Sequence, residues 1–242
     1  MADTRGTFRL KNVLSLKIKN EWINPEDTWI SPSPFIALPP DTGYFGGGTP
    51  GSRSTMDKVT YASDTTAAVP GAALSAARYG LAATGNQTAG YFGGGYIGPS
   101  RTATMDKVTY ADDTTAAVPG ANLSLARSSL AATGNSTHGY FGGGAYTAKS
   151  TMDKVTYASD TTAAVPGANL SLARYRLAAT GNQTAGYFGS GVDDGADVTT
   201  IDKITYSNDT TAAVPGANLT GSRYGVAATG TQQQLLWWWR WW

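Results

Sequence analysis

Several residue types that catalytic and metal sites commonly need are scarce in this sequence of 242 residues. It contains no cysteine, which excludes disulfide frameworks, thiolate zinc sites and cysteine nucleophiles. It contains a single histidine, His138, so general acid–base catalysis and metal binding through imidazole have almost no residues to use. We therefore predict a protein that is not an enzyme and has no catalytic residues, no metal and no cofactor.

Charged residues are also few, at 14% of the sequence, and 18 Lys and Arg against 17 Asp and Glu leave a net charge of +1. Nucleic-acid binding depends on a surplus of basic side chains that neutralise phosphates, so we expect no nucleic-acid partner. No apolar run reaches the roughly 18 residues that indicate a membrane-spanning helix. The composition favours binding through shape, hydrogen bonds and apolar contact.

Glycine, by contrast, is abundant, with 30 residues, and much of it belongs to an internal repeat. The motif Gly-Tyr-Phe-Gly-Gly-Gly, or Gly-Tyr-Phe-Gly-Ser-Gly in the last copy, recurs at spacings of 47, 49 and 47 residues. An Asp-Lys pair follows each motif, and an arginine follows 21 residues after the aspartate in every copy. In chain order the tyrosines are Tyr44, Tyr91, Tyr140 and Tyr187, the aspartates Asp57, Asp106, Asp153 and Asp202, and the arginines Arg78, Arg127, Arg174 and Arg223.

Local patterns within one repeat indicate short strands. Met56–Tyr61 alternates between two faces, as a half-buried strand does, and Thr65–Val69 is a β-rich run that stops at Pro70. Leu81–Thr84 consists mostly of small residues and precedes a turn, after which the Tyr-Phe motif opens another strand. The pattern predicts four strands in each repeat, and the recurring Thr, Gly and Pro argue against helices in the Ala-rich runs.

Four-stranded units at a period of about 40 to 50 residues are typical of β-propeller blades. We predict an all-β fold, a β-propeller of four four-stranded blades over residues 44–230. Residues 1–43 would form an N-terminal anchor arm with a Pro-rich stem, and residues 231–242 a Trp-rich assembly tail. Because the last repeat ends at Gly230 without a Tyr-Phe strand, we expect residues 44–48 to pair with the strand near 224–230 and close the ring.

The order of these elements resembles the kelch repeat. Tyr-Phe-Gly-Gly is followed by a strand ending in tyrosine, then a proline-ended segment, then the arginine; the strand-ending tyrosines are Tyr61, Tyr110, Tyr157 and Tyr206. The resemblance implies propeller blades and, as one functional alternative, a cellular scaffold that binds protein partners. Kelch propellers usually have more than four blades, so closure of the ring by two chains is the alternative to closure by one.

A second resemblance rests on the near-identity of the copies. The run TTAAVPGA begins at Thr65, Thr114, Thr161 and Thr210, and the leader EWINPEDTWISPSP precedes the first repeat. These features resemble glycine-rich repeat proteins of tailed bacteriophages, notably those that infect cyanobacteria. The resemblance implies location in the virion, a structural role in the tail or a fibre, other virion proteins as partners, and assembly as a homo-oligomer.

Length variation is confined to one loop in each repeat. The distance from the motif tyrosine to the aspartate is 13, 15, 13 and 15 residues, and sequence diverges most at 49–55, 96–104, 145–151 and 192–200. Variable loops on a constant framework are typical of a binding face. We predict that these loops contact a host surface glycan or protein, through Tyr96, Arg101, Tyr146 and Asp194.

The recurring Asp-Lys pairs and arginines are interpreted as ties between blades, because four equal copies favour a structural role over catalysis. Asp193, Asp194 and Asp197 offer oxygen ligands that calcium prefers. Their spacing lacks the regular alternation of a calcium loop, so a solvated acidic loop is the favoured interpretation.

The last eight residues, Leu235–Trp242, contain five of the seven tryptophans: Trp237, Trp238, Trp239, Trp241 and Trp242. Such a segment exposes more apolar surface than a monomer usually tolerates, so we predict an assembly element. A neighbouring subunit is the favoured site for it. A membrane interface and the chain's own repeats are the alternatives.

Overall fold

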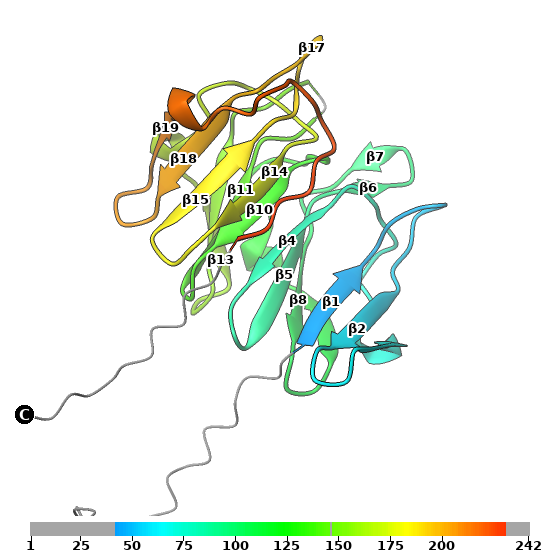
Figure 1. Ribbon diagram of the computed structural model, residues 1–242. Helices are drawn as coiled ribbons and strands as arrows, with labels where there is room; N and C mark the ends of the chain where they lie inside the picture. The colour runs from blue at the N-terminus through cyan, green and yellow to red at the C-terminus, as the bar shows by residue number, and fades with distance from the viewer. Residues whose placement is uncertain (1–41, 146, 231–242) are drawn as a thin grey trace, which may run out of the picture. The chain divides into compact units, whose positions relative to one another are not determined.

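The computed structural model describes residues 42–145 and 147–230, and over these residues the chain is all-β (Figure 1). The only helices in this part of the chain are single 3₁₀ turns, one after the last strand of each sheet: η1 (Pro70–Ala72), η2 (Pro119–Ala121), η3 (Pro166–Ala168) and η4 (Pro215–Ala217). None of the described helices is long and apolar enough to cross a membrane. The predicted anchor arm, except residues 42–43, and the predicted tryptophan tail lie outside the described residues.

Each repeat contributes one antiparallel sheet. The first sheet has the order β1 (Thr42–Gly46), β2 (Met56–Thr60), β3 (Thr65–Ala68). The second has β4 (Ala82–Gly85), β5 (Ala89–Gly93), β8 (Met105–Thr109), β9 (Thr114–Ala117). The third has β10 (Ala131–Gly134), β11 (His138–Gly142), β12 (Met152–Thr156), β13 (Thr161–Ala164), and the fourth β14 (Ala178–Gly181), β15 (Ala185–Gly189), β18 (Ile201–Thr205), β19 (Thr210–Ala213).

The strand pattern expected from the sequence is confirmed in three of the four sheets. The small-residue strand, the Tyr-Phe strand, the Asp-Lys strand and the Thr-Thr strand lie side by side in that order. In the third sheet, for example, Thr133 pairs with Tyr140, and Tyr140 with Lys154. The first sheet differs, because it has three strands among the described residues and not the four that we predicted.

The expected pairing of residues 44–48 with 224–230 is wrong. β1 pairs only with β2, and residues 224–230 form no strand. A Cβ added at Gly230 would instead lie 2.7 Å from the hydroxyl oxygen of Thr180, on the edge of the fourth sheet. The end of the last repeat packs against β14, at the edge of the fourth sheet, and not at the edge of β1.

Consecutive sheets stack on one another. The small-residue strands β4, β10 and β14 contact each other in turn, and the outer strand of each later sheet contacts the 3₁₀ turn of the preceding repeat. Both faces of the Asp-Lys strand are therefore covered, as Met105 and Asp106 show with exposed fractions of 0% each. The half-buried strand expected at Met56–Tyr61 is confirmed for β2, where Met56 is buried and Asp57 exposed. The equivalent strands β8 and β12 are covered on both faces because their sheets lie between two neighbours.

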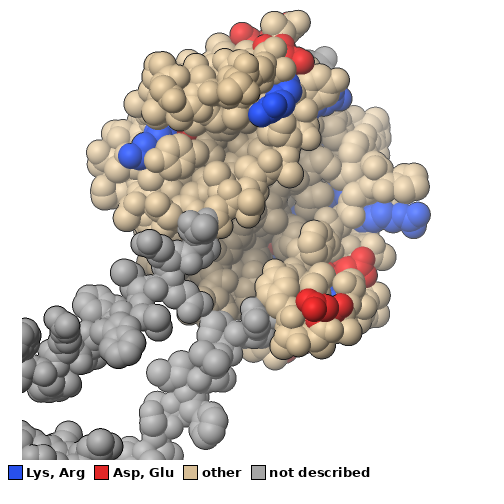
Figure 2. All heavy atoms as spheres, in the orientation of Figure 1, with Lys and Arg blue, Asp and Glu red and all other residues tan. Residues whose placement is uncertain are grey.

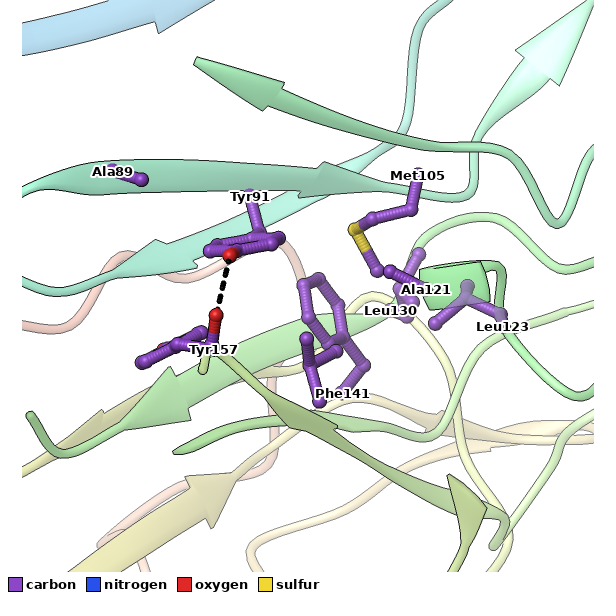
Figure 3. Close-up of a cluster of buried hydrophobic side chains, with 9 residues drawn as sticks. Ala89, Tyr91, Met105, Ala121, Leu123, Leu130, Phe141 and Tyr157 are labelled. Carbon is purple, nitrogen blue, oxygen red and sulfur yellow. Dashed lines mark hydrogen bonds between the residues drawn. The ribbon is translucent and has the colours of Figure 1, made fainter. Parts of the chain in front are cut away.

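Aromatic side chains fill the space between sheets. Figure 3 shows the cluster between the second and third sheets, in which Tyr91 and Met105 face Phe141 and Tyr157. The rings of Tyr91 and Tyr157 stack at 4.9 Å between centroids, and the Tyr91 hydroxyl donates to the Tyr157 carbonyl oxygen at 3.3 Å. A glycine at the end of each Tyr-Phe strand makes room: a Cβ at Gly93 would lie 3.0 Å from the Phe141 ring.

A buried arginine joins each sheet to the next. The main-chain N–H of Arg127 donates to Thr102 in the second repeat, while its side chain extends into the third sheet. There Nη1 lies 2.9 Å from a carboxylate oxygen of Asp153, and Nη2 donates to the Phe141 carbonyl oxygen at 3.0 Å. Arg127 and Asp153 are both fully buried, and desolvation lowers the pKa of the arginine despite the neighbouring carboxylate.

The same arrangement occurs three times, as Arg78–Asp106, Arg127–Asp153 and Arg174–Asp202, each at 2.9 Å. A second ion pair also recurs, between the lysine of one sheet and a turn aspartate of the next: Lys58–Asp113, Lys107–Asp160 and Lys154–Asp209. The interpretation of the recurring charged residues as ties between sheets is therefore confirmed for these six pairs.

The turn aspartates have lowered pKa values. Partial desolvation of Asp160 raises its pKa, but hydrogen bonds from Lys107 and Tyr91 and the lysine charge outweigh this effect. A carboxyl group whose pKa is lower in the folded state stabilises the fold above its unfolded pKa, which is about 3.9. That contribution is lost as the pH falls through the folded value.

We predict that the wild-type chain loses stability below about pH 4, and that Asp160→Asn flattens this acid dependence because the amide does not titrate. The measurement is the urea midpoint at pH 6, 4.5 and 3 for both proteins. Asp197→Asn, at an exposed position without a side-chain partner in the described residues, is the matched control and should follow wild type. If the urea midpoint depends on pH equally in Asp160→Asn and wild type, the lowered pKa of Asp160 does not contribute to stability.

Candidate functional site

The four variable loops lie at the same edge of their sheets, because each connects the Tyr-Phe strand with the Asp-Lys strand. We refer to them as hairpins 1 to 4, at residues 49–55, 96–104, 145–151 and 192–200. A glycine turn leads into each one. Gly143, for example, has φ of +70°, and a Cβ there would lie 2.6 Å from the Arg174 carbonyl oxygen, so a side chain is excluded by both conformation and space.

Short linkers connect neighbouring hairpins into a continuous row. Arg78 forms a β-bridge with Arg53 of hairpin 1, and the next residue, Tyr79, forms one with Tyr96 of hairpin 2. The linker residues Arg174 and Tyr175 bridge Lys149 of hairpin 3 and Val192 of hairpin 4 in the same way. Between hairpins 2 and 3, the Arg127 N–H donates to Thr102 and Ser128 pairs with Ala145.

Hairpin 2 presents aromatic and basic groups together. It contains β6 (Tyr96–Ile97) and β7 (Ser100–Arg101). The ring of Tyr96 stacks on that of Tyr79 at 5.0 Å between centroids. Arg101 donates from Nη2 to the Tyr96 hydroxyl at 2.6 Å, and its guanidinium lies 4.7 Å from the Tyr96 ring centroid. The sequence-predicted residues Tyr96 and Arg101 therefore form one preorganised group, with exposed Ile97 beside it.

Hairpins 3 and 4 contact each other directly. Hairpin 4 contains β16 (Val192–Asp193) and β17 (Ala196–Asp197). At its tip the exposed Asp194 accepts a hydrogen bond from the main-chain N–H of Ala148 in hairpin 3, at 2.8 Å. Asp194 thus lies in the predicted row and links two hairpins. Tyr146 lies outside the described residues.

Three tyrosines that follow the linker arginines were missed by the sequence analysis. Tyr79, Tyr175 and Tyr224 occupy equivalent positions; Tyr224 is 50% exposed. The guanidinium of Arg176 lies 5.8 Å from the Tyr175 ring centroid and 5.2 Å from that of Tyr224. A signal was present in the sequence, since the two positions after each arginine vary among the otherwise near-identical copies.

The hairpins carry several charged side chains, among them Arg53, Lys149 and Asp197. Figure 2 shows one face of the molecule, on which charged side chains are few and the acidic ones gather at the top and at the lower right. In the described part of the chain, no group of three or more His, Cys, Asp or Glu side chains is arranged to hold a metal ion. Asp193, Asp194 and Asp197 belong to one hairpin, and their carboxylates do not converge into such a group.

Comparison with known proteins does not assign the chain to a family. No protein-family model matches the sequence, and no curated protein matches it significantly.

We predict that hairpins can be exchanged between repeats without loss of the fold, because the framework holds them through main-chain hydrogen bonds. The bonds from Gly95 to Arg127 and from Gly144 to Arg174 are both 2.9 Å. Replacing residues 96–104 by the shorter sequence 145–151 should change the free energy of unfolding by less than about 1 kcal/mol. The measurement is urea unfolding, and a non-cooperative transition in the exchanged protein would show that hairpin side chains support the fold.

Proposed function

We propose that this protein is a non-enzymatic structural component of a tailed-phage virion, in the tail or a fibre, and that its hairpins contact the host surface. In this proposal the stacked sheets are blades of a β-propeller. The kelch-like order of elements and the phage-like leader support it. So does the stacking of β4, β10 and β14, since the innermost strands of propeller blades adjoin one another.

One observation carries the binding role: the buried contacts between sheets are constant, whereas the hairpins at one edge differ in length and sequence. The charged side chains of the framework are engaged in recurring ion pairs. Diversity placed on such a framework changes the outer surface without disturbing the core, which suits a surface that must follow changes in its target.

The chemistry of the row suits recognition by hydrogen bonds and stacking. The Tyr96 ring and the Arg101 guanidinium form a rigid pair, which lowers the entropy lost on binding. Tyrosine and arginine are enriched at the centres of binding surfaces. We therefore place the host contact, with a surface glycan or protein, on hairpin 2 and its neighbours.

Two measurements test the proposal. Particles purified on a density gradient from a lysate in which the chain is expressed should carry the chain at constant stoichiometry, detected by mass spectrometry and immunogold labelling. The fluorescently labelled chain should also adsorb to host cells. A chain found free in the lysate and absent from particles would contradict the virion role, and recovery bound to a cellular protein would support the scaffold alternative.

We predict that Tyr96→Ala combined with Arg101→Ala lowers adsorption to host cells at least about tenfold, because a central aromatic–arginine pair contributes about 2 kcal/mol or more. Gln87→Ala is the matched control, since Gln87 is an exposed residue in the β4–β5 turn, at the other end of the strand that leads into hairpin 2. Adsorption is measured by flow cytometry. If the double variant adsorbs as well as wild type, hairpin 2 is not part of the binding surface.

A further inference from the structure

The contact between one sheet and the next is built the same way three times. In each case an arginine and a lysine from the earlier repeat pair with two aspartates of the later sheet. A tyrosine of the earlier sheet stacks on a tyrosine of the later repeat: Tyr44 on Tyr110, Tyr91 on Tyr157 and Tyr140 on Tyr206. We call this set of contacts the junction.

Hydrogen bonds to the main chain complete the junction. A threonine of the later sheet donates to the 3₁₀ turn of the earlier repeat, as Thr162 does to the Ala121 carbonyl oxygen at 2.6 Å. A main-chain N–H just before the arginine donates to the buried aspartate, as Ser124 does to Asp153 at 3.0 Å. Charge, stacking and hydrogen bonds therefore together fix how each sheet packs on the next.

Each end of the described chain carries one half of this junction. The fourth repeat presents the earlier half, with Arg223, Lys203 and Tyr187 at the equivalent positions. The first repeat presents the later half: Asp57 and Tyr61 are exposed, and in the described residues neither side chain forms a hydrogen bond or an ion pair. The turn residue Asp64 has φ of 51°, matching 54°, 52° and 53° at the three paired turn aspartates, so its main chain already has the conformation of the paired turns.

Burial shows how much is left uncovered at these ends. Phe45 is 68% exposed, whereas its counterparts Phe92, Phe141 and Phe188 are 5%, 0% and 0% exposed. Arg223 is exposed, whereas the other three arginines are fully buried. An apolar ring and complementary charges at opposite ends of one chain are the features of a surface that normally has a partner.

We propose that the fourth repeat of one copy docks on the first sheet of a second copy of this chain and reproduces the junction between them. Arg223 pairs with Asp57 and Lys203 with Asp64 across the contact, and Tyr187 stacks on Tyr61. A head-to-tail contact of this kind closes into a ring or continues as a filament, so each copy takes part in two identical junctions.

The docked end also supplies the strand that the first sheet lacks. Residues 227–230 have the sequence Ala-Ala-Thr-Gly, identical to β4, β10 and β14, yet they are unpaired. In the complete sheets this segment pairs with the Tyr-Phe strand, for instance Ala83 with Phe92 and Thr84 with Tyr91. The same register places Ala228 opposite Phe45 and Thr229 opposite Tyr44 of the second copy, and adds a fourth strand to the exposed edge of β1.

A second copy is the occupant that the contacts specify. The described chain does not pair its own ends, because β1 is bonded only to β2 and Arg223 remains exposed. The two surfaces match residue by residue the three junctions that the chain makes inside itself. The inference does not depend on the virion role, since it uses only contacts between sheets.

Charge reversal of the two ends, applied to the full chain, tests the proposal. Asp57→Arg places two arginines in the junction, and Arg223→Asp places two aspartates there. Like charges should prevent docking, so each variant alone should stay a monomer with a mass near 25.2 kDa. An equimolar mixture of the two variants restores an opposite pair at both junctions and should assemble like wild type. Masses are measured by light scattering after size exclusion.

Matched controls use charged residues outside the junction. Arg53→Asp and Asp197→Arg reverse exposed charges on hairpins 1 and 4 and should assemble as wild type does. A wild-type chain that is monomeric at all concentrations up to about 1 mM would overturn the proposal. Assembly of either single variant at the wild-type level, or failure of the mixture to assemble when both variants are folded by circular dichroism, would overturn it as well.

A cross-linking experiment distinguishes the second copy from other occupants, and the absence of native cysteine makes it specific. Phe45→Cys and Ala228→Cys place thiols opposite each other, at the distance of a cross-strand pair. Oxidising a mixture of the two single variants should give a covalent dimer that neither variant forms alone. No dimer from the mixture, together with a rapidly formed intrachain link in the double variant, would show that the chain closes on itself and would overturn the proposal.

Discussion

The buried arginine–aspartate pair is the interaction on which the rest of the structure depends. Each of the three arginines uses its main chain to hold the hairpin of one repeat and its side chain to hold the next sheet. Taking two charges out of water is costly, and the cost is recovered only where geometry and further hydrogen bonds are good. Such a pair tolerates little displacement, so it fixes the relation of each sheet to its neighbour.

The hairpin row follows from that constraint. Because each arginine lies between two hairpins, the spacing of the sheets also sets the spacing of the hairpins. The residues beyond the framework are then free to vary, as the different tips of hairpins 2 and 4 illustrate. A surface assembled from repeated, rigidly spaced hairpins suits a binding role, and the proposed junction between copies would extend the same row from one chain to the next.

The sequence predicted the strands well and the relations between sheets less well. Alternation in Met56–Tyr61 and the proline after Val69 predict local structure, and both agree with β2, β3 and η1. The sequence indicates that Arg127 and Asp153 help to join neighbouring sheets, but not that they pair with each other. Spacing along the chain does not say which repeats are in contact. The expected closure of β1 by residues 224–230 failed for the same reason: the angle between sheets depends on side-chain packing, which a strand pattern does not contain.

The most direct test of this account is a double-mutant cycle on Arg127 and Asp153, using Arg127→Met, Asp153→Leu and the double variant. Each single change leaves a buried charge without its partner and should lower the free energy of unfolding by about 3–5 kcal/mol. The double variant replaces the pair by apolar side chains of similar size, so it should lose much less than the sum, with a coupling of about 2 kcal/mol or more. Additive losses would contradict the claim that this pair joins one sheet to the next.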